Sequence, residues 1–128
     1  MADLMRLQIP HGWTISDNKF YDIDAIVDDN GNIVNWDEGF TEDVLWIQEN
    51  IFKDSEFETP KVDCFDIDLS YLKGYYLAKL KFTTKTETHE IDTIKSIDRF
   101  EIRNKIESWL INISNNYHEF KSKMREIY

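Results

Sequence analysis

The spacing of hydrophobic residues changes once along this 128-residue chain, near residue 96. Before that point apolar and polar residues mostly alternate, which is typical of strands with one buried face. After it, apolar residues recur every three or four positions, as on the buried side of a helix. The sequence therefore predicts one domain over residues 1–128, with strands within 12–95 and helices within 98–128.

The clearest strand pattern lies in residues 64–71, where apolar side chains on one face alternate with Cys64, Asp66, Asp68 and Ser70 on the other. A turn at 72–74 leads into a second strand over 75–84, which carries Lys79 and Lys81. We expect an antiparallel pair with an acidic strand beside a basic one. Opposite charges across such a pair contribute about 0.2–1 kcal/mol each.

Shorter strands are predicted nearer the N-terminus, at 13–15 and 20–23 around a turn at Asp17-Asn18. A further hairpin, with strands at 26–27 and 33–36, surrounds Asn30-Gly31. This dipeptide would supply the two positive φ angles of a type I′ turn. A last edge strand is expected around Ile91 and Ile94.

Residues 41–52 have two interpretations. A helical face would carry Phe40, Val44, Ile47 and Ile51, with Thr41 as N-cap. The β-branched and aromatic residues of the segment favour a strand instead, and we prefer the strand.

The C-terminal pattern predicts two helices, at 98–113 and 117–127. In the first, the apolar residues form one stripe: Ile102, Ile106, Trp109, Leu110 and Ile113. Asp98 and Glu101 resemble a capping box at its start. The expected fold is α+β: an antiparallel sheet of about five to six strands with two C-terminal helices packed on one face.

The charge is divided unevenly along the chain. Residues 1–70 hold 17 Asp and Glu against 4 Lys and Arg, a net of −13, whereas residues 71–128 hold 8 against 11, a net of +3. A concentrated negative surface repels nucleic acid and acidic membranes and attracts basic proteins or cations. We therefore expect a basic protein partner, and neither nucleic acid nor membrane.

The sequence also narrows the compartment and the chemistry. A single cysteine, Cys64, excludes an internal disulfide, and no apolar run suits a signal peptide or a membrane span, so we expect a cytoplasmic protein. His11, His89 and His118 lie in no recognisable active-site motif. We expect no enzyme activity, no catalytic residue and no cofactor.

A metal site is also not expected. The stretch Asp28–Asn32 is superficially similar to a calcium loop. Aligning Gly31 with the loop glycine puts Ile26 where the first carboxylate belongs and Asp37 where a bidentate Glu is needed. A turn rich in Asp and Asn is the better interpretation.

Pairs of carboxylates remain, such as Asp66 with Asp68, which share one strand face. Such a pair could serve a hydrolase or hold magnesium, and it could equally be part of a solvated acidic sheet face. Taken together, carboxylates on a rigid sheet could imitate a phosphate backbone and fill the basic cleft of a nuclease.

Four segments resemble the small immunity proteins of bacterial polymorphic-toxin and contact-dependent growth inhibition systems: Glu42-Asp43-Val44-Leu45, Ile67-Asp68-Leu69-Ser70-Tyr71, Gly74-Tyr75-Tyr76-Leu77 and Ile106-Glu107-Ser108-Trp109-Leu110. Ser70 and Tyr71 stand where Gly and Trp would match better, so the resemblance is partial. It implies a non-enzymatic antidote that binds one cognate toxin domain, often a basic nuclease.

The leading hypothesis is therefore an immunity protein. A DNA-mimic or anti-restriction module that binds several DNA-binding enzymes is one alternative, and a carboxylate-dependent hydrolase is another. The toxin-binding residues expected from charge and predicted exposure are Trp36, Asp37, Glu38, Glu42, Asp43, Asp66 and Asp68. A core position for Trp36 is the competing interpretation. The oligomeric state is left open.

Overall fold

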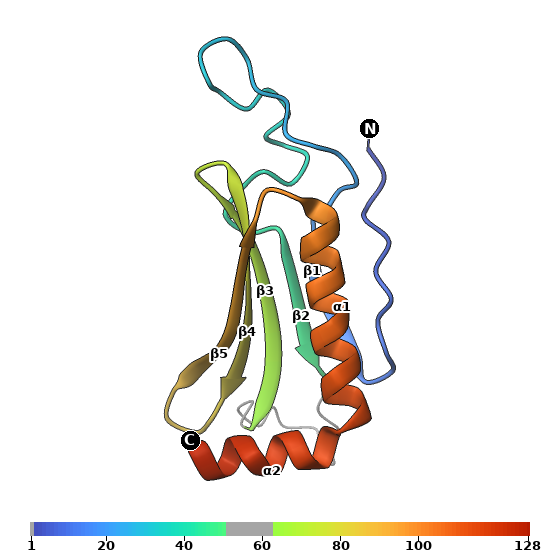
Figure 1. Cartoon of the computed structure of the whole chain (residues 1–128), viewed down its shortest axis with the longest axis vertical. Coiled ribbons are helices and arrows are strands. Elements are labelled where there is room, and N and C mark those ends of the chain that lie inside the picture. The colour runs from blue at the N-terminus through green and yellow to red at the C-terminus, as the bar shows by residue number, and fades with distance from the viewer. Residues whose placement is uncertain (1, 51–62) are drawn as a thin grey trace, which may run out of the picture.

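The computed structural model describes residues 2–50 and 63–128. Five strands form one antiparallel sheet in chain order (Figure 1): β1 (Trp13–Asn18), β2 (Leu45–Glu49), β3 (Cys64–Leu72), β4 (Tyr75–Thr83) and β5 (Thr88–Ser96). Two helices follow, α1 (Arg99–Asn115) and α2 (Tyr117–Ile127). The predicted α+β fold is confirmed. Neither helix in the described ranges has the length and apolar character needed to cross a bilayer.

Helix α1 packs along one face of the sheet through the predicted apolar stripe, all of whose members are buried. Its N-cap, Asp98, accepts a hydrogen bond from the backbone N–H of Phe100 at 2.9 Å. The backbone N–H of Asp98 donates to the Ser96 hydroxyl at 3.0 Å and not to Glu101, so the cap is one-sided. Helix α2 lies across the end of the sheet at a steep angle to α1 (Figure 1).

The core lies between α1 and the alternating apolar residues of the central strands. Ile67 pairs with Leu80 and Leu69 with Ala78, and all four are at most 5% exposed. On the opposite, open face, Asp66 pairs in register with Lys81 and Asp68 with Lys79. The predicted acidic strand beside a basic one is confirmed.

The type I′ turn lies at a different place from the predicted one. Lys73 (φ 53°) and Gly74 (φ 90°), which join β3 to β4, have the two positive φ angles that this turn needs. Between residues 28 and 32 only Gly31 has a positive φ, so the type I′ prediction at Asn30-Gly31 is wrong. The Asp28 carboxylate instead accepts hydrogen bonds from the backbone N–H groups of Asn30 and Asn32, both at 2.9 Å. This side chain organises the turn in place of two left-handed residues.

Of the two predicted N-terminal strand pairs, the pair of 13–15 with 20–23 is wrong, and the pair of 26–27 with 33–36 is reduced to a short paired segment outside the sheet. The expected turn at Asp17-Asn18 is part of β1, which pairs with β2 through a register shift after Ile15. Tyr21 makes only an isolated bridge to Leu4, and Val27 only one to Ile33. The reason is that β1 pairs with β2, which lies about 30 positions further along the chain. The segment directly after β1 is therefore not needed as its partner in the sheet.

The preferred strand in residues 41–52 is confirmed over Leu45–Glu49, where β2 pairs with both β1 and β3. Thr41 caps no helix there. The remainder of the predicted segment, residues 51 and 52, lies outside the described residues. The expected edge strand is β5, which spans nine residues.

Candidate protein-binding surface

Residues 21–43, here called the acidic loop, connect β1 to β2 and project beyond the end of the sheet (Figure 1). They contain no Lys or Arg and eight carboxylates: Asp22, Asp24, Asp28, Asp29, Asp37, Glu38, Glu42 and Asp43. Trp36 lies among them. Five of the seven residues predicted to bind a toxin therefore belong to one loop.

Buried aromatic rings fix both ends of the acidic loop. Phe20, which is 0% exposed, packs edge-on against Tyr76 with ring centroids 5.5 Å apart. Phe40 packs edge-on against Tyr71 at 4.9 Å, and the two tyrosines contact each other at 5.0 Å. Burial raises the pKa of Tyr76 far above its ordinary value, as does the neighbouring Tyr71. Both ends of the loop are therefore packed into the hydrophobic core, and the loop is not a flexible arm attached to the sheet.

Arg99, the first residue of α1, binds the near side of the acidic loop. Its Nε donates to Asp22 at 2.9 Å, and its Nη1 donates to Asp24. The hydrogen bond to Asp22 is the main cause of the raised pKa of Arg99, with the charge of Asp24 adding to it against the opposing effect of burial. Two of the eight carboxylates are thus neutralised by the C-terminal half of the chain.

Asn35 holds the interior of the loop together. Its side chain is buried; its Oδ1 accepts from the backbone N–H of Ile26 at 2.8 Å, and its Nδ2 donates to the backbone oxygen of Asp24 at 3.1 Å. The amide therefore replaces part of a β-ladder in a segment that forms no strand. The Glu38 carboxylate accepts from the backbone N–H of Ala2 at 3.1 Å, which ties the loop to the N-terminal segment.

Six carboxylates of the loop have no counter-charge among the described residues, and two of these, Asp28 and Glu38, accept hydrogen bonds from backbone N–H groups. Within the described part of the chain, the side chains of Asp29, Asp37, Glu42 and Asp43 are exposed and make neither an ion pair nor a side-chain hydrogen bond. Their negative charge is therefore available to an external partner.

The structure places Trp36 on the surface, so the competing core interpretation is wrong. Its side chain is 62% exposed. Three more apolar side chains of the same loop are also open to solvent: Ile26 at 53%, Val27 at 59% and Val34 at 59%. The sequence did not indicate these three, because their alternation was interpreted as paired strands with a buried side. The signal that could have revealed their exposure is the position of these apolar residues directly beside an acidic turn.

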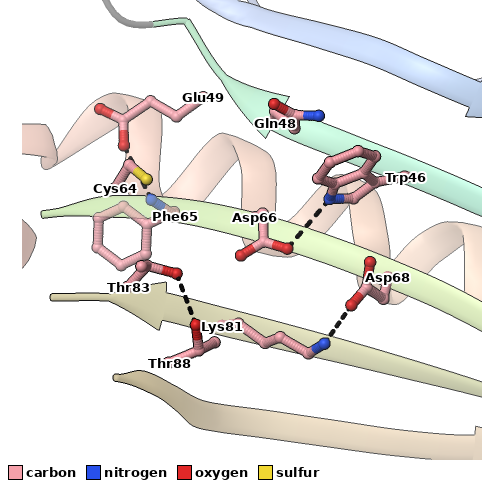
Figure 2. A pocket seen from close by; sticks show the side chains of 10 residues that line it. All are labelled: Trp46, Gln48, Glu49, Cys64, Phe65, Asp66, Asp68, Lys81, Thr83 and Thr88. Atoms are coloured by element: carbon pink, nitrogen blue, oxygen red, sulfur yellow. Dashed lines mark hydrogen bonds and ion pairs between the residues drawn. The ribbon is translucent and has the colours of Figure 1, made fainter. Parts of the chain in front are cut away.

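The predicted residues Asp66 and Asp68 lie elsewhere, on the open face of the sheet. They line a hollow of ≈ 310 Å³ together with Trp46, Lys81 and Cys64 (Figure 2). Trp46 Nε1 donates to Asp66 at 3.1 Å, and Lys81 donates to Asp68. Burial lowers the pKa of Lys81, but the hydrogen bond and charge of Asp68 outweigh it, and the net shift is upward.

A second hollow, of ≈ 530 Å³, lies beside the first on the same face. Glu42, Asp43 and Asp68 all line it, so the structure brings these three predicted residues together. Lys79 and Lys81 line it too. Lys79 also lies 3.7 Å from Glu90 on β5. The open face therefore carries mixed charge, as the predicted pairing of an acidic strand with a basic one implies. Asp37 and Glu38 line a separate depression with Tyr21 and Ile23.

A buried charged group that the sequence did not reveal lies at the other end of the sheet. The Glu49 carboxylate accepts hydrogen bonds from Lys121 at 2.7 Å, from the Tyr117 hydroxyl and from the backbone N–H of Phe65 at 2.9 Å. Burial raises the pKa of Tyr117, and the hydrogen bond to Glu49 adds to the rise. The two side-chain donors hold α2 against the sheet, and the Phe65 N–H ties Glu49 to β3, so we assign this group a structural role.

A group of side chains typical of metal binding is not assembled in residues 2–50 and 63–128. No three His, Cys, Asp or Glu side chains there are placed to hold a metal ion. Asp28, the candidate calcium ligand, already accepts two backbone N–H groups. Cys64 is buried, and His89 stacks on Tyr128 with ring centroids 4.0 Å apart.

Comparisons of the chain with protein-family models, with curated proteins and with solved structures found no match. The likeness to immunity proteins stays a prediction from the four sequence segments. Any assignment of function therefore depends on the chemistry of the surface described above.

Proposed function

We propose that this chain is an immunity-type inhibitor that binds a cognate basic toxin domain inside the cell and blocks it. The observation that carries the proposal is the acidic loop, which presents eight carboxylates without a single Lys or Arg and has Arg99 as its main internal counter-charge. Charge of this density attracts a positively charged protein and repels nucleic acid.

The way the loop is held supports an inhibitor better than a solubilising acidic segment. Phe20 and Phe40 are buried at its two ends, and Asn35 and Arg99 bind its interior. The loop therefore loses little conformational entropy when a partner binds, which strengthens binding. Complementary charge would also raise the association rate, up to about 10⁸–10⁹ M⁻¹s⁻¹ at low salt. Rapid capture suits an antidote to an incoming toxin.

The deciding experiment is a binding titration of the purified chain against the C-terminal domain of the protein encoded immediately upstream of it. We expect submicromolar affinity, and an association rate that falls about tenfold or more when the salt concentration is raised. The chain should also abolish the toxicity of that domain when both are expressed together. Absence of submicromolar binding would overturn the proposal.

A panel of unrelated DNA-binding enzymes serves as the control in the same assay. An immunity protein should leave them unbound at the concentration that saturates its cognate toxin. Comparable binding to several of them would identify a DNA-mimic module and contradict the one-partner proposal. Turnover that is lost in Asp66→Asn with Asp68→Asn would indicate a hydrolase instead.

A further inference from the structure

Two exposed apolar side chains of the acidic loop, Ile26 and Val34, are neighbours on one face of a short paired segment. Val34 N–H donates to Ile26 O at 2.8 Å, and Val27 forms a bridge with Ile33. Because side chains alternate along paired segments, Ile26 and Val34 share one face, whereas Val27 shares the opposite face with Ala25 and Ile33, and the last two pack on the core. Trp36 follows two positions after Val34. Single exposed apolar residues need no explanation, but a contiguous group marks an interaction site.

We infer that Ile26, Val34 and Trp36, here called the apolar anchor, insert into an apolar pocket rimmed by Lys and Arg on the basic toxin domain. This inference rests on the proposed function and names the surface that performs it. Large aromatic side chains at the centre of an interface typically carry most of its binding energy, and Trp36 is the largest of the three.

The charges around the apolar anchor determine the chemistry of its occupant. Asp29 and Asp37, which flank it in the sequence, are exposed and have no ion pair in the described part of the chain. A partner that buries Trp36 places its pocket rim beside these carboxylates, and only a basic rim makes that contact favourable. A second copy of this chain would bring a second set of eight carboxylates to the same place, so self-association through the anchor is disfavoured.

The open face of the sheet is the competing surface, and it fits a basic partner less well. Asp68 is bound by Lys81, and Glu90 lies 3.7 Å from Lys79. Asp66 already accepts a hydrogen bond from Trp46. A partner that binds there would have to displace or match these contacts. Within the described part of the chain, the side chains of the apolar anchor and of the neighbouring acids make no such ion pairs or hydrogen bonds. The structure therefore moves the expected contact from Asp66 and Asp68 to the acidic loop.

Preorganisation completes the argument for the loop. The Asn35 side chain bonds the backbone on both sides of Ala25, through Asp24 O and Ile26 N–H, and Asn35 is only 6% exposed. Arg99 binds Asp22 and Asp24 at the start of the loop. The anchor is thus presented in one conformation before a partner arrives, and little of the binding free energy is spent on ordering it.

The test uses the full chain and the domain encoded immediately upstream. Trp36→Ala should raise the Kd about 30-fold or more, mostly through faster dissociation. The matched control is Ile127→Ala on α2, an apolar side chain with a similar exposure of 57%, which should change the Kd by less than about twofold. Circular dichroism should show that both variants stay folded, because neither side chain is buried.

A second pair of variants tests the acidic rim. Asp29→Lys with Asp37→Lys should slow association strongly at low salt and weakly at high salt. Glu119→Lys with Glu126→Lys makes the same change in net charge on α2 and should have a much smaller effect. Equal slowing by both pairs would show that net charge alone, and not the rim, guides the partner.

The outcomes separate this inference from the proposed function. If the unaltered chain does not bind the upstream-encoded domain, both are overturned. If it binds but Trp36→Ala leaves the Kd unchanged, while Asp66→Asn with Asp68→Asn weakens it, the partner sits on the open sheet face and only this inference is wrong. Hydrogen–deuterium exchange provides a second measurement, in which amides of residues 26–36 should be protected in the complex.

Discussion

The Lys121 ammonium group donates a 2.7 Å hydrogen bond to Glu49, although the two residues are 72 positions apart. The Glu49 side chain is only 5% exposed and that of Lys121 only 14%. Helix α2 buries a single side chain fully, Met124. Its attachment to the sheet therefore relies heavily on this ion pair, which joins the acidic half of the chain to the basic half.

We expect Lys121→Met to lower the free energy of unfolding by about 3 kcal/mol, because it leaves the Glu49 carboxylate buried without its counter-charge. Lys123→Met, an exposed position on the same helix, should cost less than about 0.5 kcal/mol. Urea denaturation of both variants measures the difference. The double variant Glu49→Gln with Lys121→Met should recover part of the loss. Equal losses at Lys121 and Lys123 would show that the pair contributes nothing specific.

The same group predicts a loss of stability at alkaline pH. The pKa of Tyr117 is raised, first by burial and then by Glu49. Burial lowers the pKa of Lys121, but its hydrogen bonds to Glu49 and Tyr117 outweigh burial, so that pKa is raised as well. Both groups hold their protons more tightly in the folded chain. Their stabilisation is therefore complete below the ordinary pKa of about 10 and is lost as the pH rises through the raised values.

Urea midpoints between about pH 8 and about pH 11 test this expectation. The wild-type midpoint should fall across this range, and Tyr117→Phe should make the fall shallower, since a phenylalanine has no proton to lose. Tyr71 and Tyr76, whose pKa values burial also raises, keep some slope in the variant. A slope unchanged by Tyr117→Phe would mean that this tyrosine is equally acidic in the folded and unfolded chains.

The parts of the fold that the sequence predicted are those where side-chain spacing alone decides the structure. The alternation from 64 to 83 and the stripe from Ile102 to Ile113 each have one buried side, and burial fixes both elements. The prediction failed where pairing is long-range. Val27 and Ile33 have the local pattern of strands, but β1 pairs with β2, which leaves them in a loop.

For the candidate surface, charge indicated the segment that we propose as the binding surface, but it did not indicate all of the exposed residues of that segment. Asp37, Glu42 and Asp43 are exposed as expected. The sequence did not show which carboxylates are neutralised by distant cations, because no local pattern reveals that Lys81 binds Asp68 or that Arg99 binds Asp22. Counting charges along the chain therefore overstated the negative character of the sheet face.

Gly39 lets the acidic loop approach the backbone of Lys19, just after β1, and we expect its substitution to loosen the loop. A Cβ at this position would lie 1.9 Å from the backbone oxygen of Lys19, and φ is +93°. Gly31 has a similar φ of +82° but open space around it, so Gly31→Ala should cost only about 1–2 kcal/mol for the backbone conformation. Gly39→Ala should cost about 1–3 kcal/mol more, since the Lys19 backbone must move. Urea denaturation measures both, and equal costs would contradict the close approach.

Substitution of Arg99 separates the effect of loop preorganisation on partner binding from the effect of net charge. Arg99→Gln removes the ion pairs with Asp22 and Asp24 and changes the net charge from −10 to −11. If total charge governed binding, this variant would capture a basic partner faster and more tightly. We expect weaker binding instead, because the loop loses an attachment and must be ordered at the partner's surface. Hydrogen exchange of the amides in residues 22–27 should also accelerate in the free variant.

Arg103→Gln is the matched control for this experiment. It makes the same charge change one turn further along α1, where the guanidinium group, among the described residues, bonds the Asn104 side chain alone and lies over the Phe100 ring. We expect its Kd for the upstream-encoded domain to stay within about twofold of wild type, and its loop exchange to be unchanged. If Arg99→Gln bound as tightly as Arg103→Gln, preorganisation of the acidic loop would have no part in recognition, and its carboxylates would act as a flexible charged segment.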